Sequence, residues 1–176
     1  MSKRALKSYL NELTKKQLQE QVLDLYTRFK PVKTYYNFVF NPKEEKLLDD
    51  AKFKISKEYF PLNTRKPKTR RSVAQKIIKH YIQLGVDAFV VADVMLFNIE
   101  VAQEYCAEKP IKQDSFYTSM FKSFEEVLRF TEQHGIQSDF TIRFSNIVKN
   151  TEEKHWVNSE GFRNMISPLT PEGGIK

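Results

Sequence analysis

Residues 87–107 constrain the fold more than any other part of the sequence. Wound as an α-helix, this stretch is apolar around almost its whole circumference, and its acidic residues Asp93, Glu100 and Glu104 fall on one narrow strip. A helix that is apolar on nearly all sides is stable in water only when other elements cover it. No stretch of the chain reaches the roughly 18 continuous apolar residues of a membrane span, so a membrane is not expected to provide the cover. The stretch therefore predicts the central helix of a multi-helix domain.

The flanking sequence supplies helices that can cover this central one. Residues 72–84 and 114–134 each place their apolar side chains on one face of a helix. The chain has only 5 Gly and 7 Pro, too few for many tight β-hairpins. We predict an all-α fold, a single-domain bundle of seven or eight helices around the central apolar helix. The domain is expected to cover residues 1–166, and the tail 167–176 is expected to be disordered.

The segment 32–40, VKTYYNFVF, is compatible with either a helix or a strand. Tyr36, Phe38 and Phe40 alternate as they would in a strand, but no partner strand is evident, so a short helix is favoured. Asn41-Pro42 then predicts the start of the next helix. The aromatic side chains could form a base-stacking platform, but packing in the core is the favoured interpretation because the rings are large and apolar.

The positive charge of the chain is concentrated in one segment. The net charge is +7, and residues 61–86 contain 7 basic side chains and no acidic one. The rest of the chain has 22 basic and 22 acidic side chains. The candidate site for an anionic partner consists of these side chains: Arg65, Lys66, Lys68, Arg70, Arg71, Lys76 and Lys79. Phosphate groups would relieve the repulsion among them through charge-assisted hydrogen bonds and counterion release. The alternative is a solvated loop whose charges are met by the protein's own acidic residues.

Signals for catalysis and metal binding are absent or weak. The sequence has no phosphate-binding loop and no GxGxxG, HExxH or GxSxG motif. Cys106 is the single cysteine, which excludes an internal disulfide, and it falls on the apolar helix. We expect no catalytic residue, no metal site and no cofactor.

The acidic strip of residues 87–107 could hold a metal or take part in acid–base chemistry. The favoured interpretation is a wetted seam, or a strip that faces the basic helix before it. A wetted strip predicts that Glu100→Gln changes stability by no more than about 0.5 kcal/mol.

Three stretches resemble a family of small bacterial proteins of unknown function: SKRALKSYLNELTKKQLQEQVLDLYTRF, TYYNFVFNPKEEKLLDDAKFKISKEYFP and RRSVAQKIIKHYIQLGVDAFVVADVMLFNIEVAQEY. The similarity covers residues 1 to about 130. It implies a free-standing, helical, bacterial protein of the cytoplasm. It carries no activity and no site residue.

Together these observations predict a non-catalytic helical binding protein whose basic face docks an anionic partner, with nucleic acid favoured and RNA first. The alternative is a protein–protein adaptor, or a self-assembling module, that uses the charge asymmetry to bind itself or an acidic protein. An enzyme built on the acidic strip is a third possibility. We expect a cytoplasmic protein, without a membrane partner and with no evident small-molecule substrate.

Overall fold

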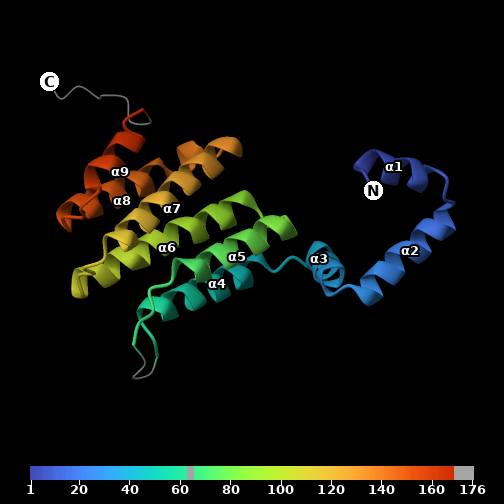
Figure 1. The fold of residues 1–176 in the computed structure, drawn as a ribbon, viewed down its shortest axis with the longest axis horizontal. Helices are drawn as coiled ribbons and strands as arrows, with labels where there is room; N and C mark the ends of the chain where they lie inside the picture. Colours follow the sequence, from blue (N-terminus) through green and yellow to red (C-terminus); the bar gives the residue numbers. More distant parts are fainter. Residues whose placement is uncertain (63–65, 169–176) are drawn as a thin grey trace. The chain divides into compact units, whose positions relative to one another are not determined.

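The computed structural model describes residues 1–62 and 66–168 of the chain. Within these residues it contains nine α-helices, one short 3-10 helix and no strand (Figure 1). In chain order the helices are α1 (Lys3–Asn11), α2 (Lys15–Arg28), α3 (Lys30–Phe40), α4 (Glu44–Tyr59), α5 (Arg71–Leu84), α6 (Ala88–Glu108), α7 (Asp114–Gln133), the 3-10 helix η1 (Gln137–Phe140), α8 (Thr141–Glu153) and α9 (Ser159–Ile166). The all-α prediction is confirmed, with at least one helix more than predicted. None of the described helices is both long and apolar enough to cross a membrane.

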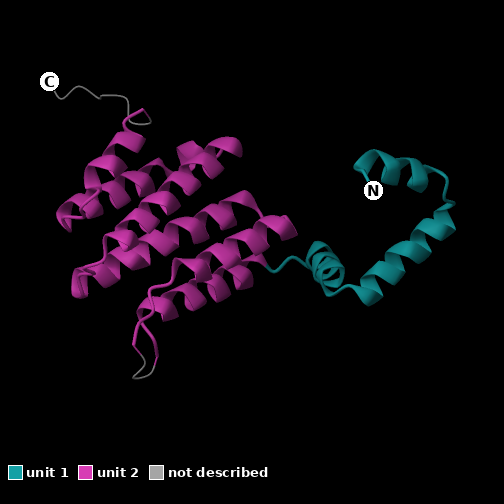
Figure 2. Cartoon of the chain, viewed as in Figure 1, with its two compact units in different colours: residues 1–43 teal, residues 44–176 magenta. Residues whose placement is uncertain are grey.

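The chain divides into two compact units, residues 1–43 (unit 1) and residues 44–176 (unit 2), as Figure 2 shows. One domain over residues 1–166 stays a prediction. Of the tail expected to be disordered, only 167 and 168 are described, and 169–176 lie outside the described residues.

Unit 1 consists of α1, α2 and α3, and its helix boundaries follow local sequence signals. Thr14 accepts a hydrogen bond from the backbone of Gln17, whose side chain in turn accepts one from the backbone of Thr14, so α2 begins with a capping box. Phe29 is extended between α2 and α3, and Pro31 lies in the first turn of α3. The favoured helix over 32–40 is thus confirmed. None of the residues in these three helices is buried.

Unit 2 is built around α6, as the sequence predicts. This helix contacts α4 and α5 as well as α7 and α8, and Figure 1 shows it between these neighbours. Val94, Leu96 and Ile99 have exposed fractions of 0%. The turn before α6 has a helix-ending glycine and a helix-starting cap: Gly85 closes α5 with a φ of 76°, and the side chain of Asp87 accepts a hydrogen bond from the Phe89 backbone at 2.8 Å.

The start of α4 differs from the prediction. Asn41 ends α3, and α4 begins at Glu44, two residues after Pro42. The carboxylate of Glu44 accepts a hydrogen bond from the backbone of Asp87 at 2.9 Å, which ties the first turn of α4 to the first turn of α6. The observed start of α4 thus coincides with a tertiary contact between Glu44 and Asp87, whereas the local Asn41-Pro42 signal predicts an earlier start.

Aromatic side chains fill the space between α7, α8 and α9. Phe124 contacts the rings of Phe144 and Phe162, with centroids 6.0 and 5.0 Å apart, and Trp156 contacts Phe162 at 5.9 Å. Edge-to-face and tilted pairs of this kind stabilise a core beyond their buried area. Part of the high phenylalanine content of the chain is therefore used to join these three helices.

Candidate anion-binding site

Glu58, on the last turn of α4, fixes the end of the basic loop. Its backbone carbonyl accepts hydrogen bonds from the backbone amides of Lys68 (2.9 Å) and Thr69 (3.0 Å). Its carboxylate accepts two more from Arg70, from Nε at 2.8 Å and from Nη2 at 2.9 Å. A bidentate arginine–carboxylate pair has a defined geometry as well as strength. The loop therefore enters α5 along a path that α4 determines.

The hydrogen bonds from Arg70 are the main reason that the pKa of Glu58 lies below its usual value. Partial burial opposes this shift, and the charges of Arg70 and Lys68 add to it. Glu58 is therefore ionised at neutral pH, and its negative charge is already matched by the guanidinium of Arg70.

An open cavity of about 390 Å³ lies beside this pair, and we call it the α4–α5 cavity. Its described lining is Lys57, Glu58, Pro61, Leu62, Lys66, Lys68 and Arg70. This lining carries four cations and one carboxylate. Once Glu58 and Arg70 are paired, the lysines at 57, 66 and 68 remain, all three exposed and none in an ion pair with another described residue. The cavity can therefore accept an anion without displacing an internal carboxylate.

Arg71 is not part of the cavity lining and is bound to α7. Its Nη2 lies 2.7 Å from Oε2 of Glu126, and its Nε donates to the hydroxyl of Ser123 at 2.7 Å. Gln75 donates to the same oxygen of Glu126 at 2.8 Å. Arg71 thus joins α5 to α7. The protein's own acidic residues therefore neutralise both Arg70 and Arg71, as the alternative to anion binding states.

The remaining candidate residues do not gather at the cavity. Lys76 and Lys79 are exposed on α5, and Lys79 lines a separate groove between α5 and α7. Arg65 lies outside the described residues. Lys57 was missed from the sequence because it precedes the acid-free segment. Its position in the last turn of the helix before a basic loop was the signal that could have found it.

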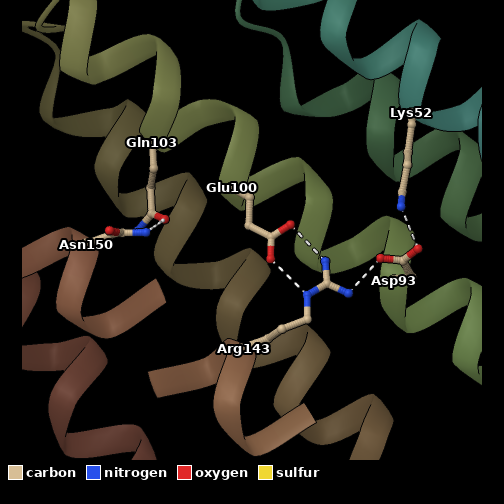
Figure 3. Close-up of polar contacts among 6 residues, drawn as sticks. All are labelled: Lys52, Asp93, Glu100, Gln103, Arg143 and Asn150. Atoms are coloured by element: carbon tan, nitrogen blue, oxygen red, sulfur yellow. Dashed lines mark hydrogen bonds and ion pairs between the residues drawn. The ribbon is translucent and has the colours of Figure 1, made fainter. Parts of the chain in front are cut away.

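The acidic strip on α6 is occupied by cations from two other helices, as Figure 3 shows. Arg143 on α8 donates to Oε1 and Oε2 of Glu100 at 2.9 and 2.8 Å, and to Asp93 at 2.6 Å. Lys52 on α4 lies 2.7 Å from the other oxygen of Asp93. Burial works against the charge of Arg143, but the bonds to the two carboxylates outweigh it and raise its pKa.

This network corrects two expectations about the strip. The strip faces α8 and α4, and not the basic helix α5. Its members Asp93 and Glu100 are paired and partly exposed, and Glu104 is exposed. Across the described residues, no group of three or more His, Cys, Asp and Glu side chains is placed to hold a metal ion. The arrangement joins α4, α6 and α8 through ion pairs.

Cys106 is buried on α6, with an exposed fraction of 6%. Burial raises the pKa of its thiol to about 11. The reactive thiolate is therefore scarce at neutral pH, as suits a core residue.

A family model described as a family of unknown function, DUF6155, matches residues 1–169. The chain belongs to this family. The match extends the resemblance noted in the sequence from about residue 130 to residue 169. No curated protein and no solved structure matches the chain. Membership of DUF6155 brings no activity with it, so the function has to be argued from the geometry.

The DUF6155 chain has a second hollow, the groove between α5 and α7, with a volume of about 560 Å³. Apolar side chains line part of it: Ile78, Ile82, Met95 and Phe130. Glutamines and charged residues make up the rest of the lining, and Ile82 is 50% exposed. An apolar strip between two helices with a polar border is the form of groove that accepts an amphipathic helix.

Proposed function

We propose that this protein is a non-catalytic binding protein that docks nucleic acid, with RNA as the first candidate, on the lysines of the α4–α5 cavity. The observation that carries the proposal is that Lys57, Lys66 and Lys68 surround a cavity whose described carboxylate, Glu58, is already paired with Arg70. Because Glu58 is paired with Arg70, the three lysines of the cavity have no ion-pair partner among the described residues, although Lys57 lies over the ring of Phe53. Phosphate groups supply the matching charge and release counterions on binding.

RNA is placed first because its single-stranded loops can bring several phosphates together on a compact cluster of lysines. The lysines can contact phosphates, and the described lining of the cavity offers no evident group of side chains for hydrogen bonds to base edges. Affinity is therefore expected to depend weakly on the nucleotide sequence. We place the protein in the bacterial cytoplasm, where RNA is available. The single, buried, unpaired cysteine suits a reducing compartment.

The test compares two charge-matched double variants by fluorescence anisotropy with labelled RNA, single-stranded DNA and duplex DNA. Lys66→Glu/Lys68→Glu reverses two charges at the α4–α5 cavity. Lys46→Glu/Lys149→Glu reverses two exposed charges on α4 and α8 that do not line this cavity. Only the first variant is expected to lose binding. The slope of log affinity against log salt should fall by roughly 0.7–0.9 for each phosphate contact removed.

Absence of binding at micromolar protein in low salt contradicts the proposal, and so does equal binding by the two variants. Circular dichroism on both variants controls for folding. Neither pair contributes to the core of unit 2, so both should retain the wild-type helical spectrum.

The second candidate function is a protein–protein adaptor, and the α5–α7 groove favours it. Its apolar lining and polar border suit an amphipathic helix of a partner protein. Ile82→Glu places a charge in this groove at a position that is already half exposed, so it should disturb docking more than folding. If nucleic acid fails to bind and this variant loses a protein partner that wild type retains, the adaptor replaces the nucleic-acid proposal.

A further inference from the structure

Unit 1 exposes aromatic side chains instead of burying them. The segment 35–40 of α3 contains four aromatic residues, and Phe40 and Tyr35 have exposed fractions of 81% and 45%. No residue of α1, α2 or α3 is buried, so these rings are not the core residues that the sequence analysis favoured. An exposed apolar cluster of this kind is typical of a binding surface.

The rings of α3 form a continuous array. Tyr36 contacts Phe40 with the two rings nearly parallel, at an interplanar angle of 21° and a centroid distance of 6.2 Å. Tyr35 meets Tyr36 edge-on at 5.5 Å, and Tyr26 of α2 approaches Tyr36 at 6.4 Å. Tyr26 also donates a hydrogen bond to Asn37 at 3.1 Å, which joins α2 to α3 beside the rings. The array is therefore held by contacts within unit 1, and Tyr35 and Phe40 are its exposed members.

The charge of unit 1 defines what this array can bind. Residues 1–43 contain nine Lys and Arg against three Asp and Glu, a net charge of +6, while residues 44–176 have a net charge of +1. Helix α3 carries Lys30 and Lys33 and no acidic residue, and Nζ of Lys33 lies 5.7 Å from the centre of the Tyr26 ring. Exposed rings and lysines on one helix, with Lys33 over the Tyr26 ring of the array, match a polymer that offers both flat apolar faces and negative charge.

Single-stranded nucleic acid has this combination of properties. Its bases present unpaired faces that stack on aromatic side chains, and its phosphates bind the adjacent lysines. In a duplex the base faces are already stacked on one another and are not available to the rings. A second copy of this chain fits less well, because two units of charge +6 repel each other.

We propose that the aromatic array of α3, with Tyr35 and Phe40 as its stacking rings and Lys30 and Lys33 as its phosphate contacts, is a second binding site that takes unpaired bases of single-stranded nucleic acid. This inference rests on the proposed function for the class of ligand. It adds a preference for single strands over duplexes, which the lysines of the α4–α5 cavity alone do not supply.

The experiment uses the full chain, with Tyr35→Ala/Phe40→Ala as the test variant and Leu23→Ala/Val39→Ala as the matched control. Leu23 and Val39 are exposed apolar residues of the same unit, at 63% and 48%, but they have no ring. The probes are a labelled single strand, an abasic strand of the same length and charge, and a duplex.

Wild type is expected to prefer the base-bearing strand to the abasic one. The test variant should bind the base-bearing strand at least about tenfold more weakly, which is the loss expected from removing one stacked base. Its binding of the abasic strand and of the duplex should be unchanged. The control variant should behave as wild type, and replacing both rings by Trp should restore the preference.

The inference is overturned if the test variant keeps the preference for bases, or if the control variant loses as much as the test variant. The second result would mean that the whole apolar surface of unit 1 docks a protein. In both cases the proposed function stands as long as Lys66→Glu/Lys68→Glu still weakens binding. Failure of every probe to bind wild type would overturn both proposals together.

Discussion

Units 1 and 2 use apolar side chains in opposite ways. Val94 of unit 2 has an exposed fraction of 0%, while Val39 of unit 1 is 48% exposed. Both valines lie on helices rich in apolar residues, so composition alone does not separate them. The difference is how far neighbouring helices cover the helix: α6 packs against α4, α5, α7 and α8, whereas the main neighbour of α3 among the described residues of unit 1 is α2. An apolar helix in this chain therefore predicts burial only when enough amphipathic helices are available to cover it.

The largest effect expected from this contrast is that of a buried charge. Val94→Asp should lower the free energy of unfolding by about 3–5 kcal/mol, because an unpaired carboxylate would lie among apolar side chains. Val39→Asp should change it by no more than about 0.5 kcal/mol, the usual range for surface substitutions. Urea unfolding followed by circular dichroism measures both. If Val39→Asp proves as destabilising as Val94→Asp, the side chain of Val39 is covered in solution and the contrast between the units is wrong.

The same contrast separates what the sequence could and could not predict. The central position of α6 follows from the distribution of its apolar residues, because a helix without a polar face has to be covered whatever covers it. The aromatic segment 32–40 has a similar apolar content, but its fate depends on which helices pack against it, and no local pattern carries that information. The segment was therefore correctly predicted as a helix and wrongly assigned to the core.

For charged residues, too, the sequence shows where they lie in the chain but not what they contact in the fold. The excess of positive charge in residues 61–86 is visible in the sequence, but the partners of Arg70 and Arg71 are not. Glu58 lies 12 positions before Arg70, and Glu126 lies 55 positions after Arg71, so only the folded arrangement of α4, α5 and α7 brings the pairs together. The candidate site could be located from the sequence to within one loop. The sequence could not show which cations of this site remain available to a ligand.

The second prediction extends the contrast from apolar side chains to ion pairs. Arg143 is 30% exposed and bound to two carboxylates on α6, while Arg28 of unit 1 is 69% exposed and pairs with Asp24 on its own helix. Arg143→Met leaves Glu100 without its ion-pair partner and Asp93 with Lys52 alone, both partly desolvated, which should cost about 1–3 kcal/mol of unfolding free energy. Arg28→Met removes an exposed pair and should cost no more than about 0.5 kcal/mol.

Thermal unfolding of the two variants at low and high salt checks this prediction. Glu100→Gln, for which a wetted strip predicted almost no effect, should now cost about 1 kcal/mol, because it weakens a charge-assisted pair of hydrogen bonds. Equal stability of the Arg143 and Arg28 variants would show that solvent screens the α6 network as fully as the pair on α2.

The smallest expected effect concerns the Glu58–Arg70 pair, and pH reveals it. The pKa of Glu58 lies below its usual value of 4.5 in the folded protein, chiefly because Arg70 donates hydrogen bonds to its carboxylate. A carboxyl group that binds protons more weakly in the folded than in the unfolded state stabilises the fold above its unfolded pKa. This contribution is lost as the pH falls below 4.5 and through the lower folded pKa. The advantage of wild type over Glu58→Gln should therefore be present at neutral pH and disappear in acid.

Urea unfolding across this range measures it, with Arg70→Met as the second background. In that background Glu58→Gln should change the pH dependence much less, because the donor that chiefly lowers the pKa is gone and only the charge of Lys68 remains. If the full pH dependence persists without Arg70, Lys68 or another cation can lower the pKa of Glu58 in its place, and Arg70 can turn to a phosphate without leaving Glu58 unpaired. The α4–α5 cavity would then present Arg70 to its ligand together with its lysines.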